Sequence, residues 1–114
     1  MFFRLYMSIS SEIIVKAFIK MANKNFLDAY LINKGNNEAG EIFLKVSNLK
    51  GYSMLYSYRK SNINKPWEIY GKESWQNDAD IDKKLDKILS IDEDVWIIEL
   101  EDKNEEFFRL KGEV

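Results

Sequence analysis

Hydrophobic residues follow two different spacings along this chain, and each change of spacing predicts a change of element. Between residues 10 and 25 they recur every three or four positions, which is typical of an amphipathic helix. The stripe expected to be buried consists of Ile13, Ile14, Ala17, Phe18 and Met21. Further apolar residues surround that stripe, namely Val15, Ile19 and Ala22. We therefore expect this helix to be covered on more than one side, with Ser10 or Ser11 capping its first turn.

Alternation with a period of two follows the helix and is typical of strands. It predicts strands at residues 26–32, 41–47 and 52–59. In the second of these, Ile42, Leu44 and Val46 share one face. We expect that face to lie against the core.

The second half of the chain predicts a further helix and up to three more strands. The helix covers residues 79–90, with Asp78 as its expected cap. Its buried stripe consists of Ile81, Leu85, Ile88 and Leu89. The predicted strands are a short one at 67–70, one at 95–101, and a hairpin partner of the latter at 106–110.

This order of elements predicts an α+β fold in one domain spanning residues 1–114. Sequential strands joined by short turns pair antiparallel, which gives a meander of about five to six strands. We expect the two helices to pack on one face of that sheet.

The residue types that are missing restrict the chemistry. The chain has no Cys and no His, which excludes disulfides, thiolate metal sites and catalytic triads that use histidine. The net charge of −2 disfavours nucleic acid and anionic membranes as partners. The sequence has no apolar run of about 18 residues, so we expect a cytoplasmic protein without a membrane span. We expect no cofactor and assign no metal ligand.

Carboxylates around strand 95–101 are the candidates for catalysis. Glu99 and Glu101 share a face and lie roughly 7 Å apart at about 3.3 Å per residue, a spacing that suits a Mg²⁺-type ion or an acid–base pair. Asp92 and Asp94 precede the strand and complete the candidate set. The same pattern is typical of a solvated strand face, which is the interpretation that we favour.

A glycine-bounded loop, Gly35 to Gly40, has the spacing that begins a phosphate-binding loop. It leads into a strand, and Glu41 and Ile42 stand where that motif has Lys and Ser or Thr, so the motif fails. We expect an ordinary turn in which both glycines have positive φ.

Two surfaces are candidates for binding. Tyr52, Tyr56 and Tyr58 share a strand face and could stack single-stranded RNA bases, but the net negative charge favours the alternative that they pack under the helices. A second candidate surface is the basic stripe of Lys16, Lys20 and Lys24. Such a stripe is most often the solvated edge of a helix, but it could also bind an acidic partner or phosphate. It could instead pair with the acidic segment near Glu99 to Glu106, within the chain or across a dimer.

Three segments carry a resemblance to a known family. They are VKAFIK at 15–20, KGNNEAGEIFLKV at 34–46 with Leu55-Tyr56 further on, and DEDVWIIELED at 92–102. Together they resemble the uncharacterised bacterial domain-of-unknown-function family 1491. The resemblance implies a small cytoplasmic α+β domain and no particular activity. Family members usually carry a glycine in the turn after Asp102, and here Asn104 could take the left-handed conformation that glycine would supply.

The sequence therefore favours a non-catalytic module that binds another macromolecule. The predicted partner is a protein, and a second copy of this chain is one candidate. The alternatives are a carboxylate enzyme that depends on Mg²⁺ or Mn²⁺, and a binder of single-stranded RNA.

Overall fold

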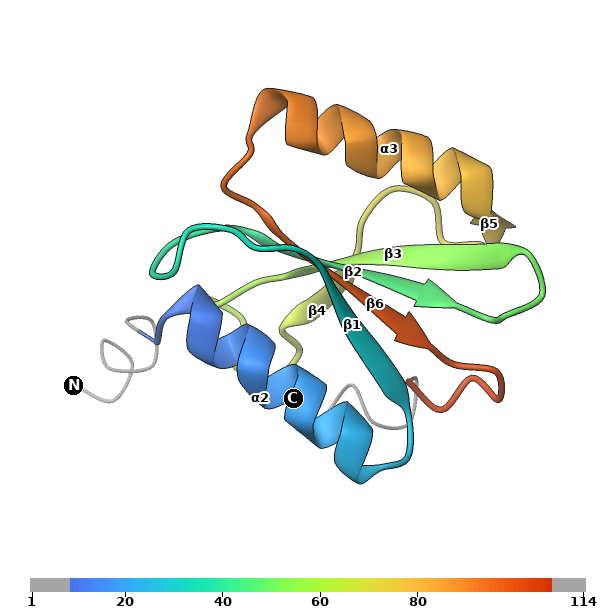
Figure 1. Cartoon of the computed structure of the whole chain (residues 1–114), viewed down its shortest axis with the longest axis horizontal. Helices are drawn as coiled ribbons and strands as arrows, with labels where there is room; N and C mark the ends of the chain where they lie inside the picture. The colour runs from blue at the N-terminus through green and yellow to red at the C-terminus, as the bar shows by residue number, and fades with distance from the viewer. Residues whose placement is uncertain (1–8, 108–114) are drawn as a thin grey trace.

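A computed structural model describes residues 9–107, which form two helices and a six-stranded sheet (Figure 1). The helices are α2 (Ser11–Lys24) and α3 (Asp78–Ile91). The strands are β1 (Asp28–Asn33), β2 (Ile42–Ser47), β3 (Tyr52–Tyr58), β4 (Trp67–Ile69), β5 (Gln76–Asn77) and β6 (Trp96–Glu101). The fold class is therefore α+β, as the sequence predicts.

The order of the strands in the sheet differs from the predicted meander. It is β1-β6-β2-β3-β4, with β5 also pairing with β3. The last strand, β6, lies between β1 and β2, antiparallel to the former and parallel to the latter. Helix α3 lies between β5 and β6 in the chain and returns it across the sheet, which is how β6 comes to run in the same direction as β2.

This insertion also makes the predicted hairpin at 106–110 impossible beside β6. Both edges of β6 are already paired, one with β1 and one with β2. Glu106 and Phe107 are not in a strand, and residues 108–110 lie outside the described part of the chain. The positive φ expected at Asn104 is instead found at Glu105, where φ is 56°.

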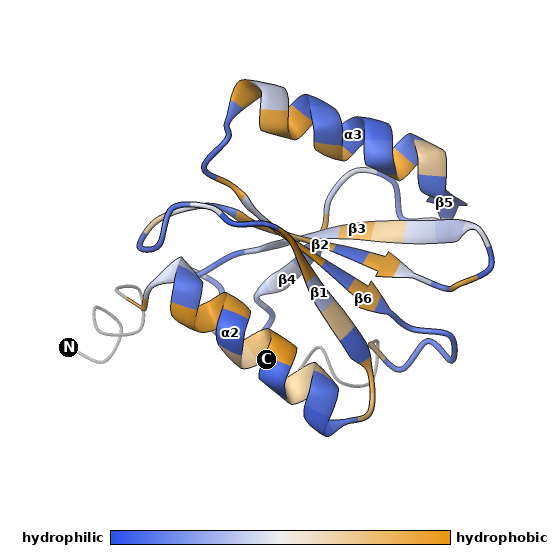
Figure 2. Cartoon of the chain, viewed as in Figure 1, coloured by the Kyte–Doolittle hydropathy of each residue, from blue (hydrophilic) through white to orange (hydrophobic). Residues whose placement is uncertain are grey.

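The two helices lie on opposite faces of the sheet, not on one face as predicted (Figure 1). Along the central strands, successive side chains enter different clusters: Leu44 packs with α2, and Phe43 packs with α3. Every residue of β2 is buried. A strand that is buried on both faces requires cover on both, and Figure 2 shows hydrophobic positions on each helix as well as on these strands.

Helix α2 begins where the sequence predicts, but a different side of it is buried. Ser10 caps it by accepting a hydrogen bond from the Ile13 N–H at 3.2 Å. The fully buried apolar residues of this helix are Val15, Phe18 and Ala22, whereas Ile13 is 61% exposed. Ser11 is buried and donates to the Gly40 carbonyl at 2.6 Å, which fixes the rotation of the helix against the loop before β2.

Helix α3 follows the predicted stripe but not the predicted cap. Ile81 and Leu85 are buried, and Ile88 and Leu89 pack against the same cluster. Asp78 is the first helical residue, and its carboxylate accepts a hydrogen bond from the Ser53 hydroxyl on β3. That bond joins the start of the helix to the sheet.

The glycines of the 35–40 loop serve close packing, which corrects the predicted turn. The glycines with positive φ are Gly51 and Gly71, at 94° and 93°. A Cβ on Gly35 or Gly40 would instead overlap the carbonyl oxygen of Asp94. The loop therefore lies directly on the chain that enters β6.

Candidate functional site

The candidate carboxylates are divided between two places. Glu99 and Glu101 lie on the α3 face of β6, because Trp96, Ile98 and Leu100 fill the α2 core as the sequence predicts. In the turn before β6, Asp92 accepts a hydrogen bond from the Asp94 N–H at 2.9 Å. At about 3.3 Å per residue, Asp94 lies roughly 16 Å along the strand from Glu99. The four carboxylates therefore do not converge on one site.

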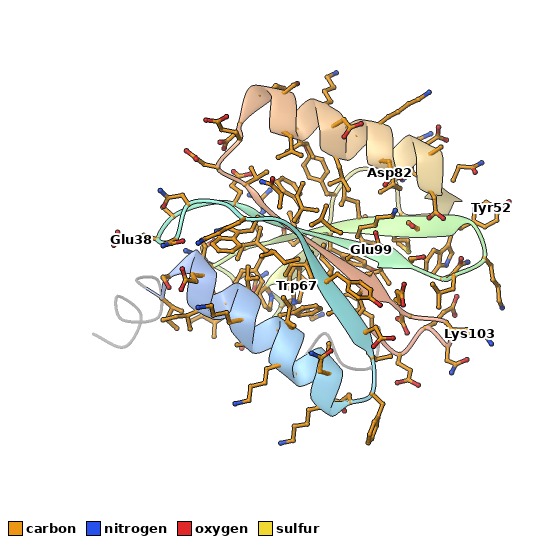
Figure 3. The ribbon with its side chains drawn as sticks, viewed as in Figure 1. Glu38, Tyr52, Trp67, Asp82, Glu99 and Lys103 are labelled. Carbon is orange, nitrogen blue, oxygen red and sulfur yellow. The ribbon has the colours of Figure 1, made fainter. Side chains whose placement is uncertain are left out.

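Figure 3 labels Glu99 on β6 and Asp82 on α3, and both carboxylates are engaged by a lysine that the sequence did not single out. The Nζ atom of Lys45 lies 2.9 Å from Asp82 Oδ1 and 3.4 Å from Glu99 Oε1. The Lys45 side chain is only 9% exposed. Burial would lower the pKa of Lys45, but the Asp82 hydrogen bond and the Glu99 and Asp82 charges outweigh it, so its pKa is raised.

The charge of Lys45 limits what this ion-pair cluster can do chemically. A lysine with a raised pKa stays charged, so it is no general base at neutral pH. The charge of Glu99 is paired within the chain, since Lys45 Nζ lies 3.4 Å from its Oε1 atom. Among residues 9–107, no group of three or more Asp or Glu side chains is arranged to hold a metal ion. What the cluster does is join β2, β6 and α3.

Glu101 contacts the outer strand of the sheet. The Tyr30 hydroxyl on β1 donates to Glu101 Oε1 at 3.2 Å. Partial loss of hydration, followed by the negative charge of Glu101, raises the pKa of Tyr30. Tyr30 stands opposite Glu99 in the register and so lies on the α3 face, beyond the cover of that helix.

The three tyrosines of β3 occupy different environments. Tyr52 is 47% exposed, whereas Tyr56 is 1% exposed and lies in the core under α2. Tyr58 is half-buried, with its ring 4.9 Å from that of Trp67 in an edge-to-face contact. Burial, together with the charge of Asp102, raises the pKa of Tyr56 to about 12. A base could therefore reach Tyr52, but it could not stack on Tyr56.

The basic stripe of α2 is solvated. Lys16 pairs with Glu12 one turn earlier, at 2.8 Å, and Lys20 is exposed. Lys24 lines an open hollow of about 540 Å³ at the end of the helix, whose other lining residues include Glu101 and Glu106. Lys24 thus shares a hollow with the acidic segment after β6.

Two apolar side chains beside this hollow have unusual backbone conformations. Phe26 has φ 62° and is 97% exposed, and Leu49 has φ 61° and is 52% exposed. Left-handed conformations are unfavourable for residues with a side chain. Both therefore hold an apolar group in solvent at a cost in backbone energy.

The outer edge of β1 is the functional candidate that the sequence did not reveal. Three consecutive apolar residues on it are exposed: Tyr30 by 47%, Leu31 by 45% and Ile32 by 53%. Within residues 9–107, β1 has a single neighbouring strand, β6. Period-two alternation identified the strand, but its place at the edge depends on the insertion of β6.

Asp102 is a further buried carboxylate that sequence reasoning missed. It is 0% exposed and accepts hydrogen bonds from the backbone N–H groups of Glu106 at 2.7 Å and Phe107 at 2.8 Å. It thereby fixes the chain that leaves β6, which is a structural role.

Comparison with known proteins identifies the family. The sequence model of the protein family of unknown function DUF1491 matches residues 9–109. The chain therefore belongs to the DUF1491 family, as its motifs suggest. No curated protein matches it.

Solved structures agree with this membership. The crystal structure of a DUF1491 family protein from Caulobacter crescentus CB15 is similar with 28% identity and a TM-score of 0.69, covering 83% of this chain and 88% of that one. An NMR structure of a DUF1491 family protein from the same organism has 27% identity and a TM-score of 0.67, with coverages of 84% and 87%. Protein Atu0922 from A. tumefaciens shares the fold at 21% identity and a TM-score of 0.70, with coverages of 87% and 90%.

No helix among residues 9–107 is long and apolar enough to cross a membrane.

Proposed function

We propose that this protein is a non-catalytic binding module whose partner is a protein, and that it binds through the outer edge of β1. The observation that carries the proposal is the exposed run Tyr30, Leu31 and Ile32 on an edge strand. The outer edge offers backbone N–H and C=O groups, and its side chains offer apolar surface. Together they suit a partner that adds a strand to the sheet.

The composition of this edge supports the proposal. Natural sheets protect their edges with lysine, proline or very short strands. The opposite edge follows that rule, because β4 has only three residues and Pro66 precedes it. By contrast, β1 has six residues and contains neither lysine nor proline. A shift of register between Leu31 and Asn33 is itself a device that protects edges, but residues 28–31 pair regularly with β6.

The geometry weighs against the two alternatives. A carboxylate enzyme would need Glu99 free to bind a cation or transfer a proton, but the Nζ atom of Lys45 lies 3.4 Å from Glu99 Oε1. A stacking surface for RNA would need Tyr56, which is buried under α2. Neither alternative gains a supporting observation.

We also propose a cytoplasmic location in a bacterial cell. The absence of cysteine gives no sign of an oxidising compartment. The similar structures come from Caulobacter crescentus and A. tumefaciens.

The test is capture of partners from an extract of the native host, with three versions of the protein. Tyr30→Lys places a charge on the proposed surface. Tyr52→Lys is the matched control, because both tyrosines are 47% exposed and Tyr52 lies on β3. We expect wild type and the control to retain the same proteins, and Tyr30→Lys to lose them. Equal retention by all three versions, or no retention together with no self-association, would refute the proposal.

A further inference from the structure

We infer that the strand which adds to the β1 edge belongs to a cationic segment of its protein, with lysine or arginine on the α3 face of the sheet and apolar residues on the α2 face. This inference rests on the proposed function, because it uses the same edge. It adds the charge of the partner and the pattern of its side chains.

The regular part of β1 determines where the side chains of an added strand would lie. Asp28 to Leu31 pair with Glu101 to Ile98 without a shift of register. Along these four residues, successive side chains therefore alternate between the two faces of the sheet. A residue of an added strand lies on the same face as the β1 residue that it stands opposite. Each of the four positions thus sets the surroundings of one partner side chain.

The α2 face of this edge is apolar. Ala29 packs against the core cluster under α2. Leu31, two residues later, lies on the same face and is 45% exposed. Their neighbours in β6, Leu100 and Ile98, belong to the same cluster. Partner residues opposite Ala29 and Leu31 would extend this surface, so we expect them to be apolar.

The α3 face of this edge carries negative charge. Asp28 and Tyr30 lie on it, opposite Glu101 and Glu99 of β6. Both are exposed, and no residue of β1 belongs to the cluster that α3 covers. Partial loss of hydration raises the pKa of Tyr30, and the nearby charges of Glu101, Asp28 and Glu99 raise it further. Of these carboxylates, Glu99 is compensated by Lys45 at 3.4 Å.

The other two carboxylates are available to a partner. Lys24 and Lys103 line the hollow at the start of β1 together with Asp28 and Glu101. None of the ion pairs within residues 9–107 joins either lysine to either carboxylate. A cationic side chain brought in on the α3 face would therefore meet two carboxylates without an ion-pair partner in the described chain. An arginine opposite Tyr30 would also lie against its ring, which favours a cation.

The two faces together predict a four-residue pattern in the partner. Lysine or arginine stands opposite Asp28 and Tyr30, and apolar residues stand opposite Ala29 and Leu31. Cationic and apolar residues therefore alternate. An acidic strand is disfavoured, because a carboxylate opposite Asp28 would face a like charge.

The experiment measures the binding of labelled peptides to the full chain by fluorescence anisotropy. The probe is a capped eight-residue peptide in which arginine and valine alternate. One control peptide has the same composition, with all arginines before all valines, and a second has glutamate in place of arginine. We expect the alternating arginine peptide to bind at least about tenfold more tightly than either control, because it alone matches both faces.

Substitutions in the protein test the contribution of the two carboxylates. The double variant Asp28→Asn with Glu101→Gln removes both charges, and glutamine keeps an acceptor for the Tyr30 hydroxyl. From typical energies of exposed ion pairs, it should raise the dissociation constant of the arginine peptide about fivefold. Glu73→Gln with Asp86→Asn is the matched control, since it changes the net charge equally at exposed positions elsewhere in the chain. It should leave the constant within about twofold.

Three results would overturn the inference: equal binding of the two arginine peptides, a double variant that binds the alternating peptide as tightly as wild type does, or peptide binding that Tyr30→Lys leaves unchanged. If wild type binds no peptide but Tyr30→Lys still abolishes the capture of partners, the cationic partner is refuted and the proposed function stands. If wild type binds no peptide and the capture test also fails, both are refuted.

Discussion

Replacing Phe26 by glycine should stabilise this protein, although it removes a large apolar side chain. Phe26 follows the C-terminal cap of α2, at the position where helices commonly carry glycine. The local hydrogen bonds are those of the Schellman motif: Phe26 N–H to the Asn23 carbonyl at 3.0 Å and Leu27 N–H to the Ala22 carbonyl at 2.9 Å. With φ at 62°, a residue that has a Cβ is strained there.

The magnitude follows from two opposing terms. Removing the strain of the left-handed conformation raises the free energy of unfolding by about 1–2 kcal/mol. The greater freedom of glycine in the unfolded chain lowers it by about 0.5–1 kcal/mol. Lost burial is negligible, because Phe26 is 97% exposed, and about 3% of a phenylalanine's area is worth roughly 0.2 kcal/mol or less. We expect a net gain of about 0.5–1 kcal/mol, or roughly 2–4 °C in melting temperature.

Phe26→Ala is the matched control, because alanine removes the ring but keeps the strained φ. Urea unfolding followed by far-ultraviolet circular dichroism should place Phe26→Gly above wild type, with Phe26→Ala within about 0.3 kcal/mol of wild type. A glycine variant no more stable than the alanine variant would show that the left-handed conformation carries no cost here. A glycine variant that is more stable but binds more weakly would indicate that the ring is kept for contact with a partner.

Three further changes test the structural contacts by chemical denaturation. Lys45→Met leaves Glu99 half-buried and unpaired, and should lower the free energy of unfolding by about 1–2 kcal/mol at pH 7. Because the folded pKa of Lys45 is raised, the stability that this lysine contributes is complete below the usual lysine pKa of about 10.4 and is lost as the pH rises above it. The difference in stability between wild type and Lys45→Met should therefore shrink at high pH. A difference that stays constant across that range would contradict the ion-pair assignment. Asp102→Ala leaves two backbone N–H groups without their acceptor and should lower the free energy of unfolding by about 2–4 kcal/mol. If Asp102 were an ordinary exposed loop residue, the same substitution would change stability very little. Gly35→Ala should cost about 1–3 kcal/mol because its Cβ overlaps the Asp94 carbonyl oxygen, and a neutral result would mean that the loop and the entry to β6 move apart freely.

The spacing of hydrophobic residues located the elements well, since both helices and the main strands lie within a few residues of their predicted ranges. It failed where long-range pairing decides. Alternation in β6 correctly predicted that Trp96 lies on one face of the sheet and Ile97 on the other. Alternation does not indicate which strands pair with β6. The assumption that sequential strands pair therefore gave a meander.

The candidate site was hidden for the same reason. Glu99 looked like a free carboxylate because its partner, Lys45, is 54 positions earlier in the chain and meets it only when β6 lies beside β2. Likewise, Tyr30 to Ile32 were expected to be an ordinary strand, and they form an edge only because β6 closes their other side. Three consecutive apolar residues at the start of β2, Ile42, Phe43 and Leu44, were the available signal that both faces of the sheet would be covered.

Hydrogen–deuterium exchange of the β1 backbone, with and without the proteins captured from the native host, tests the central claim most directly. Amides on the outer edge of β1 should exchange rapidly in the protein alone and become protected in the complex, while those of β4 stay unchanged. The Tyr30→Lys substitution should remove that protection. Exchange in β1 that is the same in both states would contradict the account.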